Sequence, residues 1–361
     1  MLVPAMQRSD AWKTFGLLIG SVVFASLLGE LAARGLGSEP ARWRLQNFVV
    51  DPSLSDSRRR VMQPDPLLGY VPRPGYRWAD ADGQSMTFDD AGFRQHHGLD
   101  PAPPNGEPVL VTGDSYAMGE EVSDDETLPA HLEQSLGRPV INAGVSGYGL
   151  DQMVLRSEAL VPLLRPQFLV VPFIADDVWR AEQRILWGVP KPYFEIEKGA
   201  LVLRNVPVPP PGDRSLDPFR RVAGYSFLVH TIMRRLGLTA YWYRGQVQHF
   251  EPSGADGRQI ACLLMGRLTR LASAGRRVLV VAEYTPQAWP GDPYYRPEAE
   301  VASAVLACAR DNGLETLDTR PVLEAEVKRG GVDRLYRLGH MSDIGNRLVA
   351  KQIAVRLGHL L

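Results

Sequence analysis

Apolar residues along this chain occur in short runs that alternate with longer segments of helical periodicity, a pattern typical of a doubly wound α/β domain. Five runs are predicted to be buried strands: Val109–Thr112, Val140–Asn142, Phe168–Val171, Arg277–Ala282 and Leu314–Leu317. The predicted helices are Leu128–Leu136, Leu150–Leu164, Ile260–Ala274, Pro297–Asn312 and Ile344–Leu357. The alternation predicts a parallel sheet with helices on both faces, and such sheets bind ligands at the carboxyl ends of their strands.

The alternation is interrupted between residues 178 and 253. This segment contains a predicted hairpin that turns at Lys198-Gly199, a proline-rich stretch at Val206–Gly212 and a predicted helix at Tyr225–Leu236. We therefore expect an insertion after the third strand, which lies beside the ligand site and influences what it binds.

Residues 14–33 are predicted to span a membrane. Thr14–Gly29 carries no charge and is rich in Leu, Val, Ile, Phe and Gly. Arg8 and Lys13 precede the run, so residues 1–13 are expected in the cytoplasm. The main domain then lies outside the inner membrane, in the periplasm of a cell with two membranes. A cleaved signal peptide and a buried soluble helix are the alternatives.

The 361 residues, 45% of them hydrophobic, are enough for one large α/β domain, predicted at 106–361. A proline-rich, membrane-proximal connector is predicted at 34–105. The net charge of −1 gives no reason to expect a nucleic-acid partner. No metal-ligand spacing occurs among the histidines and cysteines, and no cofactor is expected. Cys262 and Cys308 are expected to be buried free thiols, with a disulfide as the alternative.

Four short blocks lie where the predicted topology would gather them. They are Gly113–Tyr116 after the first strand, Asn142–Gly149 after the second, Ile174–Asp177 after the third, and Gly339–Leu348 at the last helix. A serine on a tight turn between a strand and a helix can be presented as a nucleophile. The N–H groups at the start of that helix can stabilise an oxyanion.

In this order the blocks resemble those of the SGNH (GDSL) hydrolase family, from about Asp65 to the C-terminus. The resemblance implies the three-layer, flavodoxin-like SGNH hydrolase fold, with the N-terminal helix and the insertion as additions. It implies that Ser115 is the nucleophile and His340 the general base. The oxyanion donors would be the N–H groups of Ser115 and Gly144 and the side chain at position 176.

Position 176 departs from the family pattern, because the family has an asparagine where this chain has Asp176. An ionised carboxylate would repel an oxyanion. Asp176 is therefore expected to be protonated, to turn away, or to leave the oxyanion to backbone donors.

The base also departs from the pattern. Many family members have an aspartate two or three residues before the histidine, where this chain has Leu338 and Arg337. Asp343, Asp177 or Asp333 is then expected to orient His340, unless a backbone carbonyl does so.

The main functional hypothesis is an anchored extracytoplasmic serine esterase or O-acyltransferase that acts on an acylated, in particular an acetylated, envelope polysaccharide. The alternative is a catalytically impaired domain that binds glycan or scaffolds an envelope assembly. A third hypothesis, suggested by the anchor alone, is a lipid-directed esterase.

Overall fold

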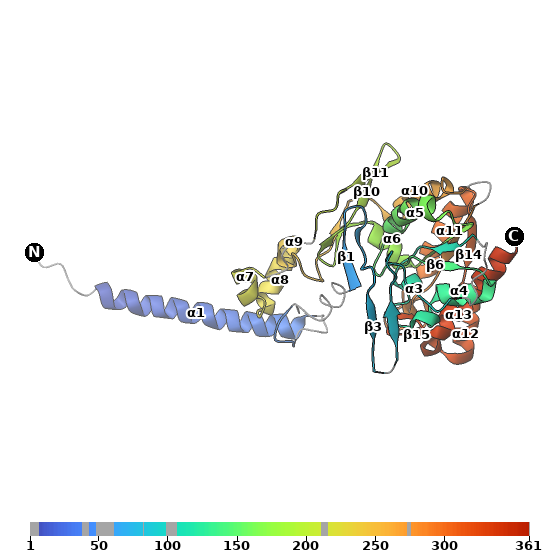
Figure 1. Ribbon diagram of the computed structural model, residues 1–361. Helices are drawn as coiled ribbons and strands as arrows, with labels where there is room; N and C mark the ends of the chain where they lie inside the picture. Colours follow the sequence, from blue (N-terminus) through green and yellow to red (C-terminus); the bar gives the residue numbers. More distant parts are fainter. Residues whose placement is uncertain are drawn as a thin grey trace, which may run out of the picture. The chain divides into compact units, whose positions relative to one another are not determined.

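The computed structural model describes residues 7–37, 43–47, 61–81, 83–98, 107–210, 216–272 and 276–360 (Figure 1). The chain forms two compact units. The helical unit comprises Met1–Pro52 and Gly212–Phe250, and the sheet unit comprises Ser53–Pro211 and Glu251–Leu361. The domain boundary expected near residue 105 lies outside the described residues.

The sheet unit is built on a five-stranded parallel sheet. In spatial order its strands are β14 (Glu315–Asp318), β13 (Arg277–Ala282), β7 (Phe168–Phe173), β5 (Val109–Val111) and β6 (Val140–Asn142). Every residue of β5 and β7 is buried, which explains why these strands are continuous apolar runs in the sequence. The expected three-layer α/β fold with a flavodoxin-like strand order is confirmed.

Helices cover both faces of the sheet (Figure 1). On one face α4 (Leu128–Leu136) packs against α13 (Asp343–Gly358). On the other face α10 (Gly257–Thr269) packs against α5 (Leu150–Leu164) and α11 (Glu298–Asp311). Right-handed crossovers require this division, because the chain reverses direction across the sheet after β6.

Shorter helices complete the sheet unit: α3 (Ser115–Met118), α6 (Ala175–Ala181), α12 (Arg320–Gly330), η1 (Asp124–Glu126), η2 (Pro286–Ala288) and η3 (Val332–Arg334). The sequence did not predict α12, which follows β14. Leu323 is completely buried in this helix, whereas five of the helix's ten other residues are charged.

The cysteine prediction was wrong. Cys262 and Cys308 form a disulfide between α10 and α11, with their Cα atoms 5.2 Å apart. The two helices pack side by side, which brings together cysteines that are 46 residues apart. Sequence periodicity placed both residues on helices but could not place them within bridging distance.

Antiparallel strands surround the main sheet: β1 (Met62–Asp65) with β2 (Gly69–Pro72), β3 (Arg77–Ala79) with β4 (Ser85–Thr87), β8 (Gln183–Leu186) with β9 (Val189–Pro190) and β12 (Glu251–Pro252), β10 (Tyr193–Glu197) with β11 (Ala200–Arg204), and β15 (Tyr336–Arg337) with β16 (His340–Met341). The hairpin expected to turn at Lys198-Gly199 is confirmed as β10–β11. The expected insertion is divided, because β8–β11 belong to the sheet unit and residues 212–250 belong to the helical unit.

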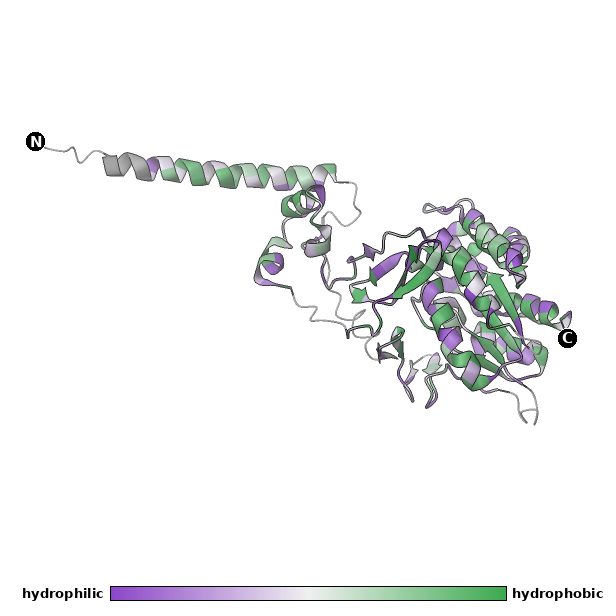
Figure 2. Ribbon diagram, turned by 90° about the horizontal axis from the view of Figure 1, so that it is seen from above, coloured by the Kyte–Doolittle hydropathy of each residue, from purple (hydrophilic) through white to green (hydrophobic). Residues whose placement is uncertain are grey.

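The helical unit contains α1 (Gln7–Leu36), α7 (Pro218–Ala223), α8 (Phe227–Arg235) and α9 (Thr239–Trp242). Figure 2 shows that α1 is largely hydrophobic. Its segment Trp12–Leu36 is long and apolar enough to cross a membrane, as a signal sequence also would be. Met233 and Trp242 are the buried hydrophobic residues of a small second core.

Candidate active site

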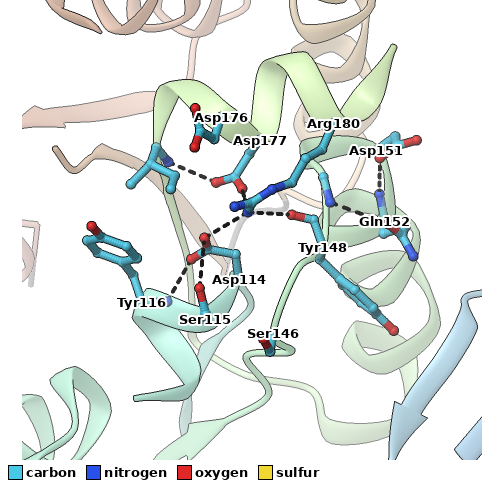
Figure 3. Close-up of polar contacts among 12 residues, drawn as sticks. Asp114, Ser115, Tyr116, Ser146, Tyr148, Asp151, Gln152, Asp176, Asp177 and Arg180 are labelled. Carbon is cyan, nitrogen blue, oxygen red and sulfur yellow. Dashed lines mark hydrogen bonds and ion pairs between the residues drawn. The ribbon is translucent and has the colours of Figure 1, made fainter. Parts of the chain in front are cut away.

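Ser115 lies on the turn between β5 and α3. A Cβ atom on Gly113 would stand 2.6 Å from the Ala117 Cβ, so this turn requires glycine. The Asp114 carboxylate caps α3 by accepting a hydrogen bond from the Tyr116 N–H at 2.9 Å (Figure 3). This cap holds the Ser115 hydroxyl at the carboxyl edge of the sheet.

His340 lies on the β15–β16 hairpin, directly before α13. The hairpin turns at Leu338 and Gly339, both with positive φ, as the tightest hairpins require. The Tyr116 hydroxyl donates a hydrogen bond to the Gly339 carbonyl at 2.8 Å and so ties this hairpin to α3. The His340 Nε2 atom lies 2.9 Å from the Ser115 Oγ atom. Two residues 225 positions apart thus form a hydrogen-bonded serine–histidine pair.

Neither of the first two acids suggested for His340 contacts it. The Asp343 carboxylate instead binds His131 Nε2, at 2.8 Å, and Arg347. Asp177 is completely buried and binds Arg180. Asp343 begins α13, so its side chain pairs across to α4 rather than with the preceding hairpin. The prediction that one of these two acids orients His340 is therefore corrected.

Two glutamates that the sequence reasoning missed lie closest to His340. The Glu120 carboxylate is 3.6 Å from Nε2, and the Glu121 carboxylate is 4.0 Å from Nδ1. The Nδ1 atom is buried and has no hydrogen-bond partner among the residues that the structure describes. Burial raises the pKa of Glu121, while His340 opposes the shift. The feature of the sequence that could have indicated them is the acidic pair Glu120-Glu121, which follows directly after Gly119 at the end of α3.

The loop that contains Glu120 and Glu121 is held by a buried arginine. Arg94, which is 1% exposed, donates hydrogen bonds to the Gly119 carbonyl at 3.1 Å and to the Val122 carbonyl at 3.0 Å. The segment before the sheet thus fixes the backbone on both sides of the glutamate pair.

A second buried arginine connects the loops after β5, β6 and β7. Arg180 Nη1 donates to Asp177 Oδ1 at 2.6 Å, to Asp114 Oδ2 at 3.1 Å and to the Tyr148 carbonyl at 3.3 Å (Figure 3). Burial and the nearby Asp114 raise the pKa of Asp177, and Arg180 opposes this shift. Arg180 therefore holds the cap of α3 in place. Its position on α6, three residues after Asp177, was the only sequence signal.

The expected oxyanion donors differ in their availability. No hydrogen bond joins the Ser115 N–H to an acceptor within the described part of the chain. The Gly144 N–H, by contrast, already donates to Asn142 Oδ1 at 3.0 Å. A Cβ atom on Gly144 would lie 2.4 Å from the Met118 N atom, so the close approach of α3 explains this glycine. In this arrangement the Gly144 N–H is therefore occupied by Asn142 and does not donate to an oxyanion.

Asp176 is paired rather than aimed at Ser115. Its carboxylate binds the Arg296 guanidinium, with a shortest distance of 2.5 Å. In Figure 3 Asp176 takes no part in the contacts drawn between Asp114, Asp177 and Arg180. Of the three expected outcomes for this residue, the structure matches a carboxylate engaged elsewhere. In this arrangement the Asp176 side chain is held by Arg296 and offers no hydrogen-bond donor to an oxyanion.

A further carboxyl group is buried behind the site. Glu283 follows β13, is 1% exposed, and neither of its carboxyl oxygens has a hydrogen-bond partner among the described residues. Burial, with a smaller contribution from Asp114, raises the pKa of Glu283 to about 8. This group is therefore neutral below that pH.

No protein-family model and no curated protein matches the chain. Several solved structures are similar to it, among them the following three. An α/β hydrolase, LAE5, from the metagenome of Lake Arreo is 14% identical over 71% of this chain and 97% of its own, with a TM-score of 0.42. An acetylxylan esterase from Geobacillus stearothermophilus is 14% identical over 70% and 95%, with a TM-score of 0.39. A G-D-S-L family lipolytic protein from Desulfitobacterium hafniense is 12% identical over 70% and 99%, with a TM-score of 0.37. Similarity at this level assigns no activity to the chain.

Proposed function

We propose that this chain is an SGNH-type serine esterase or O-acyltransferase with Ser115 as nucleophile and His340 as general base. The observation that supports this most strongly is the 2.9 Å contact between His340 Nε2 and Ser115 Oγ. A base must lie within hydrogen-bond reach of the proton that it removes. The contact occurs at the carboxyl edge of the sheet, where ligands of this fold class bind.

The reaction would proceed through an acyl-enzyme. Ser115 Oγ attacks the ester carbonyl while its proton passes to His340 Nε2. The tetrahedral oxyanion accepts a hydrogen bond from the Ser115 N–H. The intermediate expels the alcohol, which takes the proton from His340. Water or an acceptor hydroxyl then attacks the acyl group on Ser115 while His340 takes its proton. The bond between the acyl carbon and Ser115 Oγ breaks, and the Ser115 oxygen takes that proton back from His340. The choice of acceptor distinguishes hydrolysis from transfer.

We assign to Glu121 the orienting role for which the sequence suggested an aspartate. Its carboxylate is 4.0 Å from His340 Nδ1, the nitrogen that has no partner among the described residues. A carboxylate at this nitrogen fixes the tautomer and stabilises the imidazolium that forms during attack. Glu120 accepts a hydrogen bond from the Ser146 hydroxyl at 2.7 Å, which keeps this second carboxylate in place.

The proposed location is the outer side of a cell membrane, with α1 as a permanent anchor. The disulfide Cys262–Cys308 fits an oxidising compartment. The Glu30 carboxylate of α1 accepts hydrogen bonds from the backbone N–H groups of Phe227 and Leu228 of α8, which fits a helix that is retained. The proposed substrate, an acetylated envelope polysaccharide, rests on the resemblance of the sequence blocks and on this location.

A glycan-binding domain without turnover is the second candidate. It is favoured by the occupied Gly144 N–H and by the ion pair of Asp176, which together leave fewer oxyanion donors than the family pattern implies. Removing one such donor typically costs about 10²–10³ in rate.

The test uses the purified full-length chain with a serine-directed fluorophosphonate and a small acetyl ester. We expect labelling at Ser115 and its loss in Ser115→Ala. His340→Ala should lower ester turnover by about 10³-fold or more, and the double variant should be little worse, because the pair acts as a unit. Ser303→Ala, at an exposed position on α11, is the matched control and should keep its label. An unlabelled Ser115 together with no ester turnover would favour the glycan-binding domain.

A further inference from the structure

The N-terminus of α8 is capped by a side chain from α1. The Glu30 carboxylate accepts hydrogen bonds from the backbone N–H groups of Phe227 and Leu228, both at 3.0 Å, and from the Ser226 hydroxyl at 2.9 Å. Arg34, one turn further along α1, donates to Glu30 at 2.7 Å. A carboxylate is favourable at a helix N-terminus. The acidic residue that interrupts the apolar run of α1 is therefore a docking contact.

The two helices also approach closely at a glycine. A Cβ atom on Gly29 would stand 2.9 Å from a methyl carbon of Leu228. Gly16 and Gly20, on the same helix, would place a Cβ atom in open space. Gly29 and Glu30 both lie inside the segment Trp12–Leu36 that can span a membrane. Because α8 contacts Gly29 and Glu30, α8 lies at the bilayer whenever α1 spans the bilayer.

The face of α8 that touches α1 continues as an apolar row. Leu228, Ile232 and Leu236 are four residues apart and therefore lie on one side of the helical path. Leu236, directly after α8, is 67% exposed, and Ile232 is also exposed. The small core lies elsewhere, since Met233 packs with Trp242 of α9. Among the described residues of this unit, the small core therefore does not cover Ile232 and Leu236.

The short helix α7 repeats this arrangement. Phe219 and Val222 are three residues apart, and their side chains are 53% and 75% exposed. Arginines accompany both rows: Arg221 is next to Val222, and Arg234 and Arg235 precede Leu236. Exposed apolar side chains interleaved with arginines are typical of helices at the surface of an anionic membrane.

We propose that α7 and α8 lie in the lipid–water interface beside α1, with their exposed apolar side chains among acyl chains and their arginines at anionic phospholipid headgroups. Lipid is the occupant because α8 is fastened to α1 inside the membrane-spanning segment. The proposal rests on the anchoring proposed above and does not depend on the esterase activity.

The test places the full-length chain in vesicles of phosphatidylethanolamine and phosphatidylglycerol. A nitrobenzoxadiazole probe is attached at Val222→Cys, Leu236→Cys or, as the control, the exposed Lys198→Cys of the β10–β11 hairpin. Lipids with a nitroxide near the headgroup are expected to quench about half of the emission at residues 222 and 236 and about a tenth at residue 198. Arg234→Gln with Arg235→Gln should lower the quenching at residue 236.

A matched pair of glycine variants tests the docking of α8. Gly29→Leu, which places its side chain against Leu228, should reduce the quenching at residue 236 by about half, whereas Gly20→Leu should leave it unchanged. Quenching at residues 222 and 236 no greater than at residue 198 would overturn the proposal. A disulfide between the unlabelled Val222→Cys residues of two copies of the chain would also overturn it, because this face would then bind a second copy and not lipid. An intact mass without α1 would overturn the anchoring as well. None of these outcomes affects the esterase test.

Discussion

Replacing Glu121 by Gln tests whether a carboxylate outside the usual sequence position orients His340, the proposed general base. The substitution keeps the size of the side chain and removes its charge. During attack on the ester, His340 becomes an imidazolium, and in the variant this cation loses the carboxylate that faces its Nδ1 atom. The rate of acylation should therefore fall.

The expected loss follows from the geometry. At 4.0 Å and an effective dielectric constant of about 20, a pair of unit charges is worth about 4 kcal/mol, which corresponds to about 10³ in rate. The side chains of Glu121 and His340 are 28% and 24% exposed, so solvent weakens their interaction. We therefore expect kcat/KM to fall by about 10²-fold.

The assay is hydrolysis of a small acetyl ester from about pH 5 to about pH 9. Loss of the negative charge destabilises the imidazolium that forms during attack, so Glu121→Gln should lower kcat/KM throughout this range. Glu324→Gln is the control, because it removes the same charge from an exposed carboxylate that pairs with Lys328. A loss of less than about threefold in kcat/KM would refute the assignment.

Two further predictions concern the other acids. Burial raises the pKa of Glu283 from 4.5 to about 8. Between these pH values the folded chain keeps a proton on Glu283 that the unfolded chain has lost, so the free energy of unfolding falls as pH rises. In urea unfolding, Glu283→Gln should match wild type near pH 4 and exceed its stability by about 4 kcal/mol near pH 8; equal slopes with pH would contradict this. Asp176→Asn should raise kcat on the acetyl ester more than Asp176→Ala does, by up to about 10²-fold. Both substitutions remove the carboxylate that pairs with Arg296, but only asparagine supplies an amide N–H that can donate to the oxyanion. Equal rates in the two variants would exclude a donor at position 176.

The sheet could be predicted because its signal is local. Residues of β5 and β7 are buried on both faces, so each strand is a continuous apolar run in the sequence. The disulfide and the division of the insertion could not be predicted, because both depend on which helices become neighbours. The helix at Tyr225–Leu236 was expected as α8, but its contact with Glu30, almost two hundred residues earlier, left no local pattern.

The site was predictable where one short block determines the geometry. The turn at Ser115 and the loop of His340 were found from their blocks, and the structure brings them to 2.9 Å. The acids were predicted less well, because proximity in sequence favoured Asp343, whose place at the start of α13 turns it toward His131. Glu121 is 219 positions before His340, so only the tertiary fold indicates it.

The position of the acid also explains why the hairpin of His340 can lack one. Glu121 and Ser115 share one short stretch of chain, which Asp114 caps at its start and which Arg94 holds at Gly119 near its end. The β15–β16 hairpin then only needs to place the His340 imidazole next to this stretch. Its two-residue turn leaves Leu338 80% exposed, so an acid there would face solvent at little benefit to Nδ1. In the proposed mechanism, the orienting carboxylate thus belongs to the stretch of chain that contains the proposed nucleophile, Ser115, and not to the hairpin that contains the proposed base, His340.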